Sequence, residues 1–277
     1  MEVLKRIVNF YLDSSIHVAF AVFALTWVTL LQFDLDYDKN VLYFVFFATI
    51  TGYNFVKYFG VAKFHHRSLA FWLKAIQVFS FIAFIAMCYY ALRLELRSLF
   101  YLSIFGVITF LYAIPLLPMH YFRDNQKNLR QISGLKIYVI AVVWSFTTVF
   151  LPIVDNELIL NADVIIVSVQ RFIFIIVLML PFEIRDLNYD SLKLATIPQK
   201  IGIKKTKLIG VLLLMVFFFL EYFKDELSSD TIVSTLLIMS ITLLFVVFSN
   251  KNQSKYYSAF WVEGLPLIWL LILLMFR

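Results

Sequence analysis

Residues 162–202 read ADVIIVSVQRFIFIIVLMLPFEIRDLNYDSLKLATIPQKIG, and the interpretation of the whole chain starts from this stretch. Its first part, 162–182, is an almost unbroken apolar run, and its length matches the roughly 20 residues that a helix needs to cross a bilayer. Directly after it, Glu183, Asp186 and Asp190 place three carboxylates within eight residues. A membrane helix that ends in a dense acid cluster is therefore the first feature to explain.

The whole chain has the composition of a membrane protein. Of its 277 residues, 62% are hydrophobic and 15% are charged, and its mean hydropathy is +0.87. These apolar side chains exceed what one soluble core could bury. Because the runs are too long and too uniform for barrel strands, they predict an all-α bundle. We expect one multi-pass membrane domain, 1–277, with nine transmembrane helices at 16–33, 41–59, 72–92, 98–117, 136–153, 162–182, 207–223, 231–249 and 258–276.

The distribution of basic residues predicts the orientation of these helices. With the N-terminus inside, seventeen of the 24 Lys and Arg residues fall on the cytoplasmic side and five on the opposite side. Positive charge is typical of cytoplasmic loops, so we expect a cytoplasmic N-terminus and an active face on that side of the cell (inner) membrane. Acids such as Asp163 and Glu221 are expected in solvated loops on the other side. The net charge of +6 then reflects membrane topology and not nucleic-acid binding.

The acid cluster has the chemistry of a divalent-cation site. If residues 183–190 continue the helix, Glu183, Asp186 and Asp190 lie at offsets of 0, 3 and 7 and share one face. Like charges on one face repel each other unless a cation compensates them, and Mg²⁺ prefers carboxylate and phosphate oxygens. In the alternative interpretation, the acids form an interfacial cluster with neighbouring cations: Arg185, Lys193 and Lys200.

The same stretch resembles the second acidic motif of the intramembrane UbiA-type prenyltransferases. In that family an Asp-x-x-x-Asp pattern, often preceded by Ile-Arg, leads to a Thr-Leu-Pro-like turn and a Leu-Gly step. The matching residues here are Ile184, Arg185, Asp186, Asp190, Thr196, Ile197, Pro198, Ile201 and Gly202. Nine spans, an N-terminus inside and a motif at the cytoplasmic end of the sixth span extend the resemblance to the whole chain. The motif departs from the family at Glu183, where Asp or Asn is common, and at Ala195, where a basic residue is usual.

The first acidic motif of the family lies at the end of the second span and reads Asn-Asp-x-x-Asp-x-x-x-Asp. When its Asn is aligned with Asn54, the three aspartate positions hold Phe55, Tyr58 and Ala62. A basic side chain, Lys57, stands between them. The resemblance implies two metal ions between the two acidic motifs. Because the aspartates of the first motif are missing here, we expect one ion at the second motif and direct contact of Lys57 or Lys63 with the diphosphate as a point charge.

The resemblance also implies a function: transfer of a prenyl group from an isoprenoid diphosphate to a lipophilic acceptor, with aromatic acceptors among the candidates. Asp186 and Asp190 would be catalytic. The implied Mg²⁺ ligands are Glu183, Asp186 and Asp190, and the implied diphosphate ligands are Asn54, Lys57, Arg185 and Lys193. The expected partners are membrane lipid, the prenyl diphosphate and its acceptor, and the oligomeric state is left open. One rival is a non-catalytic lipid-binding or partner-binding membrane protein with the same bundle, and another is a small-molecule transporter.

Two charges inside the predicted spans are informative, because an unpaired charge at mid-membrane costs several kcal/mol. Arg171 lies near the middle of the sixth span, and Glu263 lies about 10 Å into the ninth by helical rise. We expect them either to pair with each other or to line a water-filled cavity.

Overall fold

The computed structural model describes residues 2–58, 69–113, 134–188 and 196–277, and every regular element in these ranges is helical. The expected all-α class is therefore confirmed for the described part of the chain. The elements are α1 (Glu2–Asp13), α2 (Ile16–Gln32), α3 (Lys39–Tyr58), α4 (Leu69–Ala91), α5 (Leu96–Ala113), α6 (Leu135–Ser145), the π-helical segment η4 (Phe146–Phe150), α7 (Leu151–Asp155), α8 (Ala162–Asp186), α9 (Ile197–Phe219), the 3-10 turn η6 (Leu220–Phe223), α10 (Ser229–Phe248), the π-helical turn η7 (Tyr257–Val262) and α11 (Leu265–Phe276).

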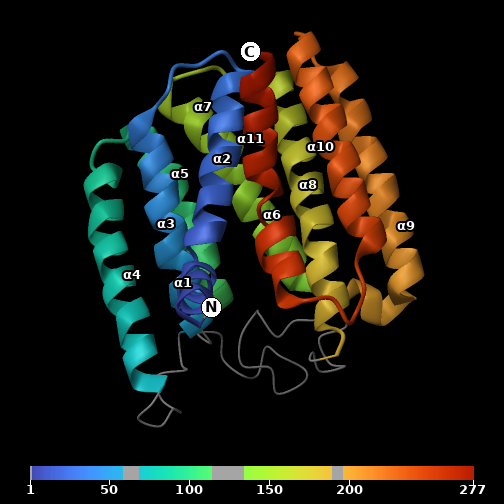
Figure 1. Ribbon diagram of the computed structural model, residues 1–277. Coiled ribbons are helices and arrows are strands. Elements are labelled where there is room, and N and C mark those ends of the chain that lie inside the picture. The colour runs from blue at the N-terminus through green and yellow to red at the C-terminus, as the bar shows by residue number, and fades with distance from the viewer. Residues whose placement is uncertain (1, 59–68, 114–133, 189–195) are drawn as a thin grey trace, which may run out of the picture.

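The helices pack into one bundle, with the two termini at opposite ends (Figure 1). The central helix is α8, which contacts α6, α9, α10 and η7. Of its most apolar 18-residue stretch, 72% is buried. The edge helix is α4, which packs mainly on α3. Only 11% of its own most apolar 18-residue stretch is buried. Contacts of α11 with both α2 and α10 join the first helices of the chain to the last. The acid-bearing helix therefore runs through the middle of the fold.

Within the described residues, six helices are long and apolar enough to cross a membrane, or seven if the bent pair α1 and α2 forms one span. The six are Leu73–Ala91, Leu135–Asp155, Ala162–Asp186, Ile197–Phe223, Ser229–Phe248 and Tyr257–Phe276. The other three predicted spans, 16–33, 41–59 and 98–117, overlap α2, α3 and α5. The helices thus support a multi-pass membrane protein, while nine crossings and a cytoplasmic N-terminus stay predictions.

Local sequence signals explain where α8 and α9 begin. The side chain of Asn161 caps α8 by accepting a backbone N–H of the first turn at 3.0 Å. At the start of α9, the N–H of Thr196 donates to the Gln199 side chain at 3.0 Å, and Pro198 occupies the first turn, where its fixed φ suits a helix. A kink follows at Gly202, whose φ of +79° carries little steric penalty without a Cβ.

The end of α8 differs from the sequence prediction. The helix carries Glu183 and Asp186 one turn apart and ends at Asp186. Leu187 and Asn188 form a turn, so the expectation that the helix continues from 183 to 190 is wrong at these two residues. Asp190 itself lies outside the described residues.

An aromatic cluster fills the centre of the bundle. Phe174 on α8 lies 5.4 Å from Phe217 on α9 and 5.2 Å from Trp269 on α11, measured between ring centroids. The third pair, Phe217 and Trp269, is 5.6 Å apart. Offset and edge-to-face pairs at these distances add about 0.5–1.5 kcal/mol each beyond the burial of their area, so the three rings hold three helices together.

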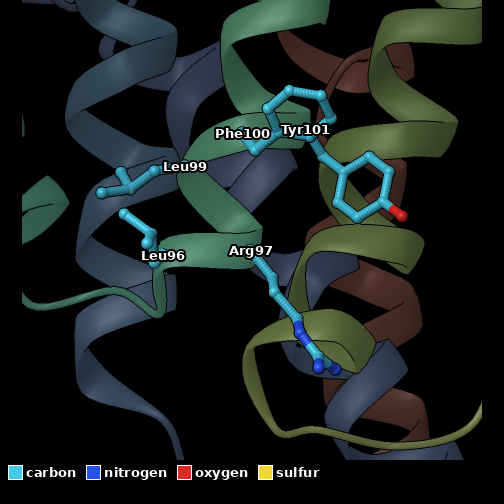
Figure 2. A pocket seen from close by; sticks show the side chains of 5 residues that line it. All are labelled: Leu96, Arg97, Leu99, Phe100 and Tyr101. Atoms are coloured by element: carbon cyan, nitrogen blue, oxygen red, sulfur yellow. The ribbon is translucent and has the colours of Figure 1, made fainter.

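A hollow of about 680 Å³ lies along the first turns of α5 and is lined by Leu96, Arg97, Leu99, Phe100 and Tyr101 (Figure 2). In this view Arg97 and Tyr101 point to the same side of the helix. The N–H of Glu95 donates to Asp155 at the end of α7, which places this hollow at the end of the bundle opposite Asp186. The hollow is therefore separate from the acid cluster.

Close helix packing at Gly210 generates a testable prediction. A Cβ at this position would lie 2.9 Å from Leu180 Cδ1 and 3.0 Å from Val246 Cγ1. Because Leu180 and Val246 are themselves buried, they have little room to move away, and overpacking of this kind costs about 1–3 kcal/mol. We expect Gly210→Ala to lower the thermal unfolding midpoint in detergent by several degrees.

The matched control is Gly106→Ala. A Cβ on Gly106 meets nothing within 4 Å, and alanine is favoured over glycine inside a helix by about 1 kcal/mol. This variant should unfold at the same temperature as the wild type or higher. Equal midpoints for the two variants would contradict the packing argument.

Candidate functional site

The last turns of α3 and α8 and the π-helical turn η7 lie at the same end of the bundle, the lower end in Figure 1. We call this the site end. It contains Lys57, Arg185 and Asp186 of the predicted site residues. Glu263, which directly follows η7, interacts electrostatically with both Lys57 and Arg185, so charged groups from three helices gather there.

Arg185 is the most connected side chain of the site end. Its Nε and Nη2 each lie 2.7 Å from Asp186 Oδ1, and its Nη1 donates to Ser258 Oγ on η7 at 2.7 Å. Its guanidinium also lies 5.4 Å from the Phe182 ring centroid. The side chains of Arg185 and Asp186 are 21% and 22% exposed, so the pair is half-buried and still accessible. Among the described residues, Asp186 Oδ2 has no hydrogen-bond partner.

Glu183 binds the beginning of the next helix. The residue is 5% exposed, and its Oε2 accepts a hydrogen bond from the N–H of Ile197, the first residue of α9, at 3.2 Å. A carboxylate is favourable at a helix N-terminus, where backbone N–H groups lack intrahelical partners. One of the two Glu183 oxygens is thus engaged in joining α8 to α9.

Asn54 joins three helices and is only 3% exposed. Its Oδ1 accepts from Ser15 Oγ at 2.8 Å. Its Nδ2 donates to the carbonyl of Ser14 at 2.9 Å and to Ser80 Oγ at 2.8 Å. These bonds satisfy both amide hydrogens and the carbonyl oxygen, and they fasten α3 to α4 and to the turn between α1 and α2, where the chain bends by 57°.

Lys57 is held more loosely. Its Nζ donates to the carbonyl of Asp13, the last residue of α1, at 2.9 Å, and lies 3.9 Å from Asp13 Oδ1. The Tyr58 hydroxyl donates to the same carbonyl at 2.9 Å. The Lys57 side chain is 43% exposed, so its ammonium can exchange this carbonyl for another acceptor. Tyr58, at an aspartate position of the first family motif, therefore serves here as a partner for the end of α1.

The predicted metal site extends beyond the described residues. Asp190, Lys193 and Lys63 lie outside them, so none of the three can be placed relative to Asp186. Within the described part of the chain, no group of three or more His, Cys, Asp or Glu residues is arranged to hold a metal ion. Of the two described acids, Asp186 has a free oxygen of the hard type that Mg²⁺ prefers, whereas Glu183 is engaged at α9. The donor chemistry of Asp186 therefore fits Mg²⁺.

The proposed pair of Arg171 and Glu263 is wrong. Arg171 is 1% exposed, donates from Nη2 to Thr29 Oγ1 at 3.1 Å, and has its guanidinium 4.9 Å from the Trp269 ring centroid. Within the described residues it has no carboxylate partner, and its Nε and Nη1 have no hydrogen-bond partner. The cations that act on Glu263 are instead Lys57 and Arg185.

Acids at the opposite end are more buried than the sequence predicted. Glu221 is 1% exposed, and its carboxylate accepts from Lys224 Nζ at 2.7 Å and from Gln170 Nε2 at 2.9 Å. Asp163 is 7% exposed and accepts from the N–H of Asp225 at 2.9 Å. Burial lowers the pKa of Lys224 even though the Glu221 carboxylate acts in the opposite direction. The expectation of solvated loop acids is therefore wrong for Glu221 and Asp163.

Sequence reasoning missed the contribution of η7 to the site end. Ser258 binds Arg185, and Glu263 interacts electrostatically with the same guanidinium. The available signal was Gly264 and Pro266, because glycine and proline directly after a charged residue in an apolar span indicate an interrupted helix.

Comparisons with known proteins support the fold. No protein-family model matches the sequence, and no curated protein is significantly similar to it. A solved structure of a digeranylgeranylglyceryl phosphate synthase in membranes superimposes with a TM-score of 0.58 at 16% sequence identity. The match covers 100% of this chain and 97% of that one. The chain therefore shares the fold of this membrane synthase over the aligned length, which agrees with the fold that the sequence resemblance implied.

The hydrogen bonds of Asn54 predict a structural role that can be measured. Replacing Asn54 with Ala removes two buried hydrogen bonds and one part-buried one, and it leaves the Ser14 carbonyl without this donor. We expect a loss of about 2–4 kcal/mol of unfolding free energy, seen as a lower thermal midpoint in detergent. Asn252→Ala, at an exposed position, is the control and should leave the midpoint unchanged. Weaker prenyl diphosphate binding at unchanged stability would assign Asn54 to the ligand instead.

Proposed function

We propose that this chain is a UbiA-like prenyltransferase that transfers an isoprenoid group from a prenyl diphosphate to a lipophilic acceptor. The observation that carries the proposal is the gathering of Lys57, Arg185 and Asp186 at one end of an apolar bundle. A diphosphate that carries an isoprenoid tail has the complementary form, because its charged head suits the polar end and its tail suits the apolar interior. The whole-length likeness to a prenyltransferase fold supports the same proposal.

The proposed diphosphate ligands differ in what they must give up on binding. Lys57 is 43% exposed and exchanges one backbone carbonyl for a phosphate oxygen. Arg185 has a planar fork of donors that suits phosphate, and it exchanges its bond with Ser258 or part of its pairing with Asp186. Lys193 is proposed as a third cation. Asn54 would have to break buried hydrogen bonds, so we assign it a supporting role beside Lys57.

We propose Mg²⁺ as the metal, held by Asp186 and Asp190, with Glu183 as a further ligand only if it releases the N–H of Ile197. When bound, Mg²⁺ neutralises negative charge that develops on the leaving diphosphate. The chain itself keeps the Asp186 carboxylate half-buried and oriented by Arg185. Its apolar interior would exclude water from the allylic carbon. We further propose that this end faces the cytoplasm, because the excess of Lys and Arg lies on this side.

A second candidate function is a non-catalytic binder of lipid or of a partner protein with the same bundle. Specific observations favour it: two predicted ligands, Asn54 and Glu183, are engaged in contacts between helices. Phe55 and Tyr58 also stand at positions where the family has aspartates. Turnover separates the two candidates, because a binder should retain labelled prenyl diphosphate without forming product from a membrane extract.

The proposal predicts the effect of Asp186→Asn on purified protein. The asparagine keeps an oxygen for Arg185 but removes the charge that a divalent cation requires, so Mg²⁺-dependent binding of a labelled prenyl diphosphate should fall at least tenfold while the thermal midpoint changes little. Asp230→Asn, at the partly exposed first turn of α10 at the opposite end, is the matched control and should bind normally. Tight binding that ignores both Mg²⁺ and Asp186 would refute the metal assignment.

A further inference from the structure

The last predicted span is interrupted at Glu263 and Gly264. These residues form a turn between η7 and α11, and the helix is visibly broken there in Figure 1. Gly264 leaves no room for a side chain, because a Cβ would lie 2.8 Å from the Phe260 carbonyl oxygen and 3.4 Å from the His17 ring. π-Helical turns and interrupted membrane helices are frequently found at functional sites.

A histidine on the opposing helix fixes the position of η7. His17 Nε2 lies 2.8 Å from the Phe260 carbonyl oxygen. The imidazole ring of His17 also stacks on the Phe260 ring, with the centroids 5.0 Å apart. His17 Nδ1 lies 2.9 Å from the Tyr11 hydroxyl. The carbonyl can only accept, so Nε2 donates to it and Nδ1 accepts from Tyr11 in the neutral tautomer. The turn that carries Glu263 is thereby fastened to α1 and α2.

The Glu263 carboxylate is close to cations but bonded to none of them. Its side chain is partly exposed and interacts electrostatically with Lys57 and Arg185, and also with Tyr11. No residue in the described ranges donates a hydrogen bond to its carboxylate oxygens. Asp186, by contrast, is bound directly by Arg185. Of these two acids, Glu263 is therefore the one whose oxygens are both available.

Glu263 also lies deeper in the bundle than the cations. The Glu263 N–H donates to the Ser258 carbonyl at 3.0 Å. The hydroxyl of the same serine accepts the hydrogen bond from Arg185. Glu263 is thus one π-helical turn further from the site end than Arg185. With a diphosphate head at Lys57 and Arg185, the first carbon of an isoprenoid tail would lie inward of the cations, on the Glu263 side.

We propose that Glu263 is the proton acceptor of the transfer reaction, an inference that rests on the proposed function. In this step the bond between the allylic carbon and the diphosphate oxygen breaks, and its electron pair leaves with the diphosphate. A bond forms between the allylic carbon and a nucleophilic carbon or oxygen of the acceptor. The proton that this atom loses passes to a Glu263 carboxylate oxygen. The acceptor is therefore a lipophilic molecule with a removable proton at the reacting atom, such as an alcohol or a phenol.

The test compares turnover with binding in purified full-length protein, with labelled geranylgeranyl diphosphate and farnesyl diphosphate as donors and a membrane lipid extract as the acceptor source. Glu263→Gln keeps the size of the side chain but removes its basicity. We expect kcat to fall at least 100-fold, the usual scale for a general base. The Kd for the donor should stay within threefold of the wild type or decrease, because a negative charge near the diphosphate is lost.

Chemical rescue excludes a merely structural role. Glu263→Ala should lose turnover, and added formate should restore it by at least tenfold, because a small carboxylate can occupy the vacated space. Glu226→Gln, an exposed acid at the opposite end, should keep wild-type kcat and should not respond to formate. Glu263→Asp, which moves the carboxylate by one methylene, should retain partial turnover and provides a readout if the glutamine variant fails to fold.

The outcomes are distinguishable. If the wild type turns over and the kcat of Glu263→Gln is within threefold of the wild-type value, the role of Glu263 is overturned and the proposed function stays intact. A parallel loss of donor binding and turnover without formate rescue would also overturn it, since that pattern indicates a structural residue. Donor binding without any wild-type turnover would overturn both proposals and favour the binder.

Discussion

The guanidinium of Arg185 links the end of α8 to η7, and the arrangement of charge at the site end depends on this link. One side of the group pairs with Asp186 and another donates to Ser258. The ion pair and this hydrogen bond hold Arg185, Asp186 and Ser258 in place when no ligand is bound, and because the two charged side chains are 21% and 22% exposed, water stabilises them as well. An anion that binds Arg185 must replace one of these existing bonds, to Asp186 or to Ser258.

The predicted ligands can be ranked by the bonds they would lose. The buried Asn54 side chain makes two hydrogen bonds to the bend between α1 and α2 and a third to Ser80 on α4, so breaking them would disturb the contacts of α3 with both. Lys57 has one backbone carbonyl and a side chain that is 43% exposed, so its exchange costs little. Asn54 and Lys57 have the same expected role from sequence, but they differ in how readily they can bind a ligand. The difference comes from their burial and from the hydrogen bonds that each one makes.

The fold was largely predictable, because hydropathy and the need to satisfy every backbone group leave few options for such a chain. The expected span 162–182 corresponds to α8, which runs four residues further to Asp186. The partners of the site residues were not predictable from spacing, because they are distant in sequence: Arg185 and Ser258 are 73 residues apart, and Asn54 and Ser15 are 39 apart. Periodicity shows which residues share a helix face but not which helix packs against that face.

The mistaken pair of Arg171 and Glu263 has a simple geometric cause. Arg171 precedes Arg185 by fourteen residues on one helix, which separates them by about 21 Å along its axis. Glu263 is only one turn from Ser258, which contacts Arg185. The two charges lie at different depths, and the π-helical turn that sets the depth of Glu263 leaves no distinct hydropathy signal.

Charge balance at the site end constrains any function of this chain. Before a ligand binds, the described charges at the site end include the cations Lys57, Arg185 and Lys255 and the carboxylates of Asp13, Asp186 and Glu263, so these groups are close to neutral. A diphosphate adds further negative charge, which at these separations is unfavourable unless more cations arrive. They must come from a divalent ion or from lysines such as Lys193 and Lys200 that follow α8 in the sequence. The uncharged residues Phe55 and Tyr58 are consistent with this balance, because an aspartate at either position would increase the positive charge that a bound diphosphate requires.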